Sequence, residues 1–283
     1  MELKVLKDIP PWEWPQDTDK MLLGILLDNQ KNKSDRLLAA DLAGDYTVIN
    51  DELAVVLLSI VRNDAESEDL RARAVISLGP ILETAYFDEF EDTEDVPISE
   101  ETFHTIQTSL RDLYMDIDAP MEVRRRTLEG SVRAPQEWHQ EAIRDAYFSG
   151  DDLWRLTAVF CMRYIRGFDT QILEALKAEN EEIHYEAVCA AGTWEVDAAW
   201  SHIMSLATSE LTAKSLRLAA IEAVASIRPQ EAEEILRDLT LSDDEDIAEV
   251  AFEAMAMSGL LPDEDYDDYD DDDDDDWDER TLH

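Results

Sequence analysis

A nine-residue segment recurs seven times along the chain, and this repetition constrains the fold more than any other feature. The copies read "RLLAADLAG", "RARAVISLG", "RRRTLEGSV", "WRLTAVFCM", "HYEAVCAAG", "LRLAAIEAV" and "AEVAFEAMA", and they begin at Arg36, Arg71, Arg124, Trp154, His184, Leu216 and Ala248. Successive copies are 35, 53, 30, 30, 32 and 32 residues apart. A period of this length is typical of repeat proteins in which each copy is one supersecondary unit.

Two positions of the segment form columns when the copies are aligned. The fourth position is always small: Ala39, Ala74, Thr127, Thr157, Ala187, Ala219 and Ala251. The eighth position holds Ala43, Leu78, Ser131, Cys161, Ala191, Ala223 and Met255. Residues four apart lie on one face of a helix, and small side chains there let a neighbouring helix approach closely. The columns therefore predict helices that stack side by side.

Helical periodicity runs through the chain, and strand signals are nearly absent. We expect fourteen helices in seven pairs, at 17–29, 34–44, 51–63, 67–82, 99–115, 119–132, 136–148, 151–165, 170–178, 181–194, 197–207, 213–227, 229–241 and 244–257. In the second of these helices, Ser34 is the predicted N-cap and Gly44 the predicted C′ residue. The long step of 53 residues equals one repeat plus about 20 residues. The acidic stretch at about 87–98 accounts for that extra length.

The helix pairs, with second helices of the form R-x-x-A-x-x-x-L-G, resemble the HEAT-repeat family, and within it the short HEAT-like units of phycobilisome-lyase-type proteins. The resemblance covers about 15–258. It implies an all-α fold: an α-solenoid of about seven helix pairs, wound into a right-handed superhelix, with the second helices along the concave face. We expect the solenoid at 17–258 and an N-terminal cap at 1–16, where Trp12 and Trp14 cover the first repeat. A disordered acidic tail is expected at 259–283.

Charge narrows the range of partners. The formal net charge is -44, and the stretch from 263 to 280 holds fourteen acids and one arginine. The remaining -31 is spread over the repeats, so the surface repels phosphate backbones and anionic lipid. We therefore expect no direct nucleic-acid partner and no membrane, and a protein partner that is basic. An acid-biased proteome, in which surface carboxylates only maintain solubility, is an equally good explanation of the charge of the repeats.

Catalytic signals are weak. The chain contains no H-E-x-x-H, G-x-S-x-G, G-x-G-x-x-G or P-loop pattern and no zinc-type cysteine and histidine spacing, so no metal or cofactor is expected. The resemblance to lyase-type proteins implies chromophore handling, for which Cys161, Cys189, Trp194 and His184 are the available side chains. Small core residues are the better interpretation of the two cysteines.

Arginines near the start of the second helices form the first candidate binding surface. Arg124, Arg125 and Arg126 are the densest group, with Arg133 close by, and Arg155 and Arg217 occupy similar positions in later repeats. A basic stripe on the concave face would bind an acidic peptide or a phosphate group. The favoured alternative is a ladder of ion pairs to carboxylates of adjoining repeats.

Aromatic residues form the second candidate surface. Trp154, His184 and Tyr185 belong to a group of aromatic residues and histidines concentrated in the fourth to sixth repeats. Such side chains anchor protein interfaces, although packing between repeats explains them as well and is favoured.

The acidic tail is the third candidate. Asp270, Asp273 and Asp276 belong to a run of seven aspartates that Trp277 follows. A tail that only maintains solubility needs no aromatic residue. The tail is therefore either a solubilising segment or an acidic segment that binds a basic surface with its aromatic residues as anchors.

These observations favour a non-enzymatic scaffold, adaptor or assembly factor that grips a protein segment on its concave face. The alternatives are a nucleic-acid mimic or chaperone-like inhibitor of a basic protein, and a lyase-like enzyme or chromophore chaperone. The N-terminus lacks a basic region followed by an apolar stretch, and no apolar run approaches 18 residues, so a cytoplasmic protein is expected.

Overall fold

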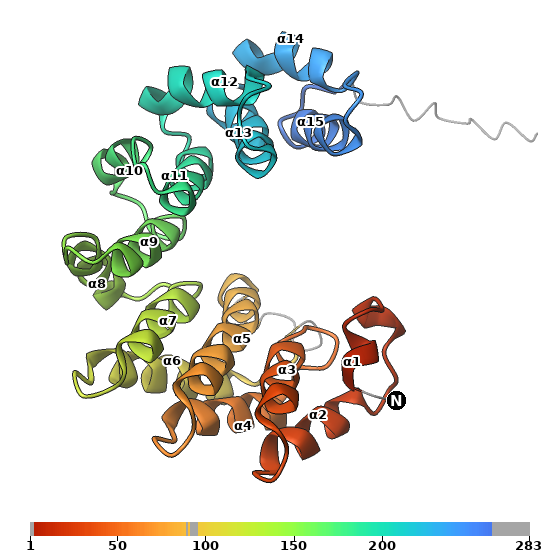
Figure 1. Ribbon diagram of the computed structural model, residues 1–283, viewed down its shortest axis with the longest axis vertical. Coiled ribbons are helices and arrows are strands. Elements are labelled where there is room, and N and C mark those ends of the chain that lie inside the picture. Colours follow the sequence, from red (N-terminus) through yellow and green to blue (C-terminus); the bar gives the residue numbers. More distant parts are fainter. Residues whose placement is uncertain (1–2, 89, 91–95, 262–283) are drawn as a thin grey trace, which may run out of the picture.

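The computed structural model describes residues 3–88, 90 and 96–261, and within them the chain forms helices and no strand (Figure 1). The helices are α1 (Leu3–Leu6), α2 (Thr18–Leu27), α3 (Lys33–Ala43), α4 (Asp51–Arg62), α5 (Glu68–Phe87), α6 (Glu100–Met115), α7 (Met121–Ser131), α8 (Glu137–Tyr147), α9 (Asp152–Cys161), α10 (Asp169–Ala175), α11 (Glu181–Thr193), α12 (Trp200–Thr208), α13 (Lys214–Ile227), α14 (Pro229–Leu239) and α15 (Glu245–Met257). Two single turns of 3₁₀ helix, η1 (Pro11–Glu13) and η2 (Asp197–Ala199), precede α2 and α12.

Helices α2 to α15 form seven consecutive pairs, in which the even-numbered helix comes first and packs against the odd-numbered one. The second helices also pack on one another in order, from α3 through α5, α7, α9, α11 and α13 to α15. Figure 1 shows the pairs arranged as an arc, with the second helices along its inner side. The predicted all-α solenoid with fourteen paired helices is therefore confirmed, while the handedness of the superhelix remains a prediction.

The small-residue columns form the contacts between repeats. All fourteen column residues are buried, from Ala39 and Ala43 in α3 to Ala251 and Met255 in α15. Gly44 also lies at a contact between repeats, and it does not form the left-handed C′ turn that the sequence predicted. Its backbone is not left-handed, and a Cβ there would clash with the backbone carbonyl of Ser77 in α5. The glycine is therefore needed for the close approach of α3 and α5.

Side-chain caps begin many of the helices. Asn32 caps α3 by accepting the Asp35 N–H, so the predicted cap at Ser34 is wrong by two residues. An asparagine oxygen satisfies an orphan N–H as well as a serine does, and here the asparagine comes first.

Helix α5 runs five residues past its predicted end and contains Pro80. Burial of the apolar residues after Pro80 stabilises this extension against the loss of one backbone hydrogen bond.

An arginine near the start of several second helices binds the end of the first helix of the same pair. The Nε or Nη atom donates to the carbonyl ten residues earlier: Arg36 to Leu26, Arg71 to Val61, Arg124 to Tyr114 and Arg217 to Ala207, at 2.9–3.0 Å. The last carbonyls of a helix lack partners within the helix, so these bonds cap four of the first helices. In the sixth pair the capping residue is Arg217, one position after the Leu216 that the sequence alignment placed there.

The buried apolar residues fall into two clusters that meet at α7. One cluster joins α1 to α6 with Val123 of α7, and the other joins Leu128 of α7 to α15. His139 in α8 is buried at this junction. Its Nδ1 accepts the Gln136 N–H at 2.9 Å, and its Nε2 lies 3.0 Å from the Ser131 hydroxyl. This arrangement links α8 to the end of α7.

The N-terminal segment covers the first pair as predicted in part. Helix α1 packs on α3, and the half-buried Trp14 donates from its indole N–H to the Leu6 carbonyl. Trp12, by contrast, is mostly exposed and does not cover the first repeat.

Val96 and Ile98, near the end of the acidic insertion, are buried in the first cluster, so this end of the insertion belongs to the core. Among the described helices, none combines the length and apolar character that crossing a bilayer requires.

Candidate functional site

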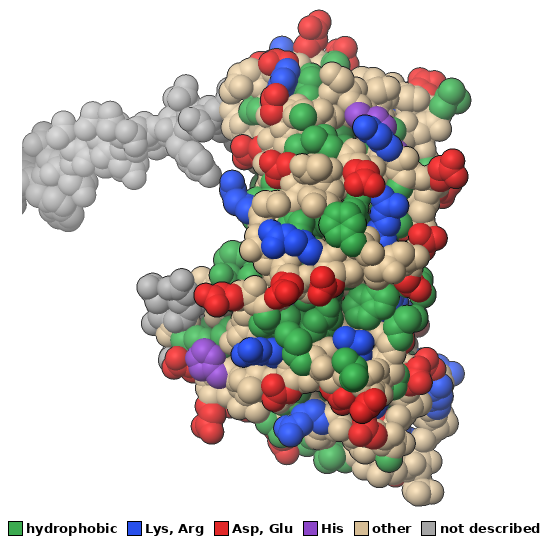
Figure 2. Space-filling model, turned by 90° about the vertical axis from the view of Figure 1, so that its left-hand side faces the viewer, with side chains coloured by type: hydrophobic (Ala, Val, Ile, Leu, Met, Phe, Trp, Pro, Cys, Tyr) green, Lys and Arg blue, Asp and Glu red, His purple; other side chains and the backbone are tan. Residues whose placement is uncertain are grey.

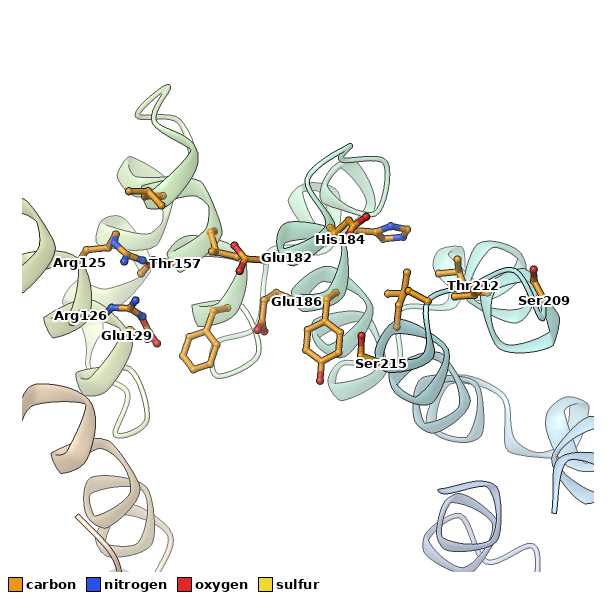
Figure 3. Close-up of a pocket in the computed structure, with 18 of the residues that line it drawn as sticks. Arg125, Arg126, Glu129, Thr157, Glu182, His184, Glu186, Ser209, Thr212 and Ser215 are labelled. Carbon is orange, nitrogen blue, oxygen red and sulfur yellow. Dashed lines mark hydrogen bonds and ion pairs between the residues drawn. The ribbon is translucent and has the colours of Figure 1, made fainter. Parts of the chain in front are cut away.

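A groove of about 1020 Å³ runs along the second helices of the third to sixth pairs. We call it the concave groove. Its lining comes from α7, α9, α11, α12, α13 and the turn between α12 and α13, namely Arg125, Arg126, Glu129, Leu153, Leu156, Thr157, Phe160, Glu181, Glu182, His184, Tyr185, Glu186, Leu206, Ser209, Leu211, Thr212, Ala213, Ser215 and Leu216. Figure 3 shows Glu182 and Glu186 between the arginines of α7 and the hydroxyl groups of Ser209, Thr212 and Ser215.

The fifth pair lines the groove through its second helix alone. Its first helix, α10, has only seven residues, whereas the other first helices have nine to sixteen. Neither α10 nor the turn that follows it, residues 176–180, contributes a residue to the lining, while the neighbouring α12–α13 turn forms a wall.

The two arginines in the groove are already paired with carboxylates. Arg125 is buried and binds Glu122 through two nitrogens, at 2.8–3.1 Å, and the Thr157 hydroxyl at 2.8 Å. Arg126 bridges Glu122 at 2.9 Å and Glu129 at 2.6 Å. Although burial works in the opposite direction, hydrogen bonds from both arginines lower the pKa of the Glu122 carboxyl. Neither guanidinium is free to hold a phosphate or an acidic peptide.

Carboxylates in the groove are in excess. Glu181 and Glu182 are exposed at the start of α11 and have no ion-pair partner among the described residues. Glu186, one turn further on, is largely buried, and burial raises the pKa of its carboxyl while Arg163 only partly offsets this. Its Oε2 atom has no hydrogen-bond partner within the described chain and lies 3.6 Å from Arg163 Nη1. Because this oxygen is itself buried, Arg163 is the cation within its reach.

Apolar side chains line the groove between the charged groups. Leu156 and Phe160 lie one turn apart on α9, Tyr185 lies on α11, and Leu206 and Leu216 come from the sixth pair. All five are half-buried, so each keeps apolar surface available for a ligand. An apolar lining with acidic neighbours suits an amphipathic segment that carries basic residues. Figure 2 shows the outer side of the arc, on the left in Figure 1, where hydrophobic side chains lie among acidic and basic ones.

A pair of histidines lies at the edge of the groove. His184 Nε2 in α11 is 3.0 Å from His202 Nε2 in α12, which requires one ring to donate and the other to accept. Burial, together with the neighbouring His202, lowers the pKa of His184. The pair therefore joins the fifth and sixth repeats in its neutral form. No group of three metal-ligating side chains occurs in the described residues.

The structure divides the sequence-predicted site residues into two sets. Arg125, Arg126, His184 and Tyr185 line the concave groove. The other four, Arg124, Trp154, Arg155 and Arg217, do not line it.

The four residues outside the groove make contacts within the repeats. Arg124 caps α6, and its guanidinium lies over the rings of Tyr114 and Trp154. Arg155 donates to the Tyr147 hydroxyl at 3.2 Å and stacks over that ring. Arg217 caps α12. The tail residues Asp270, Asp273, Asp276 and Trp277 lie outside the described residues.

Several other basic residues form ion pairs between repeats, as the ladder interpretation predicts. Pairs that connect successive second helices or the turns before them are Arg36–Glu66, Arg73–Asp41, Arg133–Glu83, Arg163–Glu186 and Lys214–Asp244. Arg133 also stacks over Phe160 and Tyr164, so its planar face is covered. Other arginines, including Arg125 and Arg126, pair within their own helix instead. The basic stripe is thus a packing and pairing feature in the described repeats.

The cysteines are poorly placed for thiol chemistry. Cys161 is fully buried, and burial raises the pKa of its thiol well above the usual value. Burial also raises the pKa of the half-buried Cys189. A reactive cysteine requires the opposite, a lowered pKa and access to solvent. Cys161 is a small core residue of the stacking columns, and Cys189 packs half-buried beside the same core.

The sequence did not single out the apolar residues of the groove or its three glutamates on α11. Leu153, Leu156 and Phe160 recur at helical spacing on α9, on a different face from the buried Thr157 and Cys161. That second apolar stripe was the available signal. It was missed because an outward apolar stripe and a buried one have the same period.

The chain was compared with known protein families, curated proteins and solved structures. No protein-family model matches the sequence, and no curated protein matches it either. An X-ray structure of YibA from Escherichia coli is similar, with 17% sequence identity, a TM-score of 0.46, and coverage of 92% of this chain and 86% of that one.

Proposed function

We propose that the protein is a non-enzymatic, HEAT-like scaffold or adaptor whose concave groove binds a basic, amphipathic segment of a partner protein. The observation that carries the proposal is the composition of the groove. Its arginines are neutralised by their own glutamates, its remaining charge is carboxylate, and its walls are apolar. Such a surface attracts a cationic segment over distance and holds it by apolar burial.

Glu181 and Glu182 are central to this proposal. Both carboxylates are exposed at the start of α11 and have no ion-pair partner among the described residues, so they would attract a lysine or arginine of the partner. Because they are exposed, they would add electrostatic attraction rather than a fixed contact. The apolar walls of the groove would hold the bound segment.

The test is affinity capture from the native cell extract, followed by measurement of the dissociation constant with the purified partner at two salt concentrations. Glu182→Lys and Tyr185→Ala should each weaken binding. Glu141→Lys, which changes an exposed glutamate of α8 outside the groove, is the matched control and should leave affinity unchanged apart from a small charge effect. Equal effects of Glu182→Lys and Glu141→Lys, with none from Tyr185→Ala, would show that only net charge matters.

Deletion of 263–283 separates this proposal from the alternative that the chain mimics a nucleic acid. A groove-bound partner should retain most of its affinity without the tail. A partner held by charge alone should lose affinity steeply with salt and with tail deletion, because screening removes long-range attraction.

A further inference from the structure

Large apolar side chains are exposed at the same place in four of the helix pairs. The turn between the first and second helix of a pair carries Ile117 in the third pair, Phe148 in the fourth, Leu211 in the sixth and Leu241 in the seventh, with exposed fractions of 81%, 68%, 98% and 81%. Each lies three or four residues before its second helix. We call these four residues the apolar turn row.

The row is unusual in a chain with a net charge of -44, because the same turns could carry polar residues at no cost to the core. None of the four side chains fills a gap between repeats, since all are largely exposed. The turns of the first, second and fifth pairs carry polar residues at the equivalent position, Asn29, Asp64 and Lys177. The row is therefore confined to the part of the arc that contains the groove.

The row is continuous with the concave groove. Leu211 belongs to both, and Leu153, one turn after Phe148, forms the facing wall. The fifth pair, which has the seven-residue first helix α10, has no member of the row. The equivalent turns follow one edge of the solenoid, because the second helices stack on one another in order.

A carboxylate accompanies each apolar side chain. Asp118 follows Ile117, Asp152 follows Phe148 at four residues, Glu210 precedes Leu211, and Asp243 follows Leu241 at two residues. All four carboxylates are exposed, and none has an ion-pair partner within the described residues. The edge therefore carries an apolar and an acidic group at about 10 Å per pair, the usual spacing of packed helices, with a double interval across the fifth pair.

We propose that this edge extends the binding site, so that the occupant is a single long basic amphipathic helix lying along the apolar turn row with its middle in the groove. The inference rests on the proposed function. From the third to the seventh pair the row spans about 40 Å, which corresponds to a helix of about 27 residues. Its apolar stripe contacts the row, and flanking lysines or arginines meet the four carboxylates. A second copy of this chain is a poor occupant because two such acidic edges repel each other.

The test uses two synthetic peptides of leucine and lysine with helical amphipathic spacing, one of 27 and one of 13 residues. The shorter peptide spans about 20 Å and reaches only the groove. A 27-residue peptide with alanine in place of leucine keeps the charge and serves as the reference for purely electrostatic binding. Fluorescence anisotropy at physiological salt measures the dissociation constants with the full chain.

The edge variant is Ile117→Ser/Leu241→Ser, which changes the two ends of the row. Both side chains are more than 80% exposed, so the variant should fold like the wild type. The variant should weaken binding of the 27-residue leucine peptide by about tenfold, because burial of two such side chains is lost. Binding of the 13-residue peptide should be unaffected. Leu27→Ser, at the exposed end of α2 near the first turn, is the matched control and should change neither.

The possible outcomes separate the two proposals. If both leucine peptides bind equally tightly and the edge variant has no effect, the row is not part of the site, and the groove proposal stands when Tyr185→Ala weakens both. If Tyr185→Ala weakens neither peptide, or if the alanine peptide binds as tightly as the leucine peptide of the same length, the groove proposal fails and the extension fails with it.

Discussion

The first three helix pairs and the last four are built from the same repeat, yet they pack differently. In the first three pairs, both rows of helices are continuous, because α2 contacts α4 and α4 contacts α6 as well as the second helices contacting one another. From α8 onward, successive first helices make at most marginal contact in the described chain, and the second helices alone connect the repeats. Two rows of helices therefore connect the first three pairs, whereas a single row, that of the second helices, connects the last four.

The first helices also differ in length. Helices α4 and α6 have 12 and 16 residues, whereas α10 and α12 have seven and nine. Length alone does not account for the packing, because α2 contacts α4 with only 10 residues, while α8 and α14 have 11 each. Most of the concave groove lies where the second helices alone connect the repeats, and α7 is the contribution of the first three pairs to its lining. The comparison teaches that one repeat can pack through two rows of helices or through one.

Glycine substitutions should give the largest difference in stability between the two parts. Gly44→Val forces a side chain into the Ser77 backbone between α3 and α5, and we expect a loss of about 3 kcal/mol in the free energy of unfolding. Gly192→Val meets Ala223 at 2.9 Å in the single-row part, where α13 can shift, so a loss of about 1–2 kcal/mol is expected. Urea denaturation followed by circular dichroism measures both.

The control is Gly24→Ala, because a Cβ there contacts nothing within 4 Å. It should stabilise α2 by about 0.5–1 kcal/mol through the lower helix propensity of glycine. An equal loss in the Gly44 and Gly192 variants would show that the two parts are equally rigid.

The junction of the two parts should be sensitive to acid through His139. Burial lowers the pKa of this histidine to about 4, whereas in the unfolded chain it is near its ordinary value of about 6.5. The folded state therefore binds its proton only at lower pH, and the stability from neutral His139 is complete above pH 6.5 and is lost as the pH falls towards 4. Between pH 7.5 and 5 the loss is about 2 kcal/mol.

Carboxylates also titrate in this range, so the measurement is the difference between the wild type and His139→Gln across the pH series. Glutamine retains an acceptor and a donor without a titrating ring. The stability difference between the two proteins should shrink as the pH falls from 7.5 to 5. A difference that stays constant would contradict a buried neutral histidine at the junction.

Substitution of the capping arginines should give a smaller difference in stability between the two parts. Arg71 is buried, donates to the Val61 carbonyl and pairs with Asp64 at 2.7 Å, so Arg71→Met should cost about 2 kcal/mol. Arg217 caps α12 from a half-buried position without an ion pair among the described residues, and Arg217→Met should cost about 1 kcal/mol. Arg62→Met, at an exposed arginine that forms no ion pair with the described chain, is the control for lost charge. Equal effects of the three substitutions would show that the caps contribute no stability.

The smallest effect is expected at the exposed turns. Leu211→Ser should change the free energy of unfolding by less than about 0.5 kcal/mol, because that side chain is 98% exposed. Leu57→Ser in α4, which is fully buried between the two rows, serves as the opposite reference and should be severely destabilising. A clear loss of stability in Leu211→Ser would mean that the apolar turn row has a structural role and would remove the reason to treat it as a binding surface.

Much of the fold could be predicted from the sequence because local signals repeat. Seven copies of one pattern average out the errors of any single helix, so the pairs and the buried columns at Ala39, Cys161 and Ala223 agree with the structure. Helix ends were less accurate, as Asn32 and the extension of α5 past Pro80 show, because caps and burial compete there. The site was predicted only in part. Tyr185 and His184 reach the groove, while Trp154 and Arg124 pack against each other instead.

By itself, the sequence determined the all-helical repeat and the positions at which neighbouring helices touch. Both depend on periodicity and side-chain size, which are local properties. Only the tertiary structure decided which charges are free. Arg125 and Glu182 look alike in the sequence as exposed charges on second helices, yet Arg125 is enclosed by Glu122 and Thr157, while Glu182 stays exposed without an ion-pair partner among the described residues. The physical reason is that the burial of a charge depends on how closely neighbouring repeats approach it, and packing sets that approach rather than the local pattern.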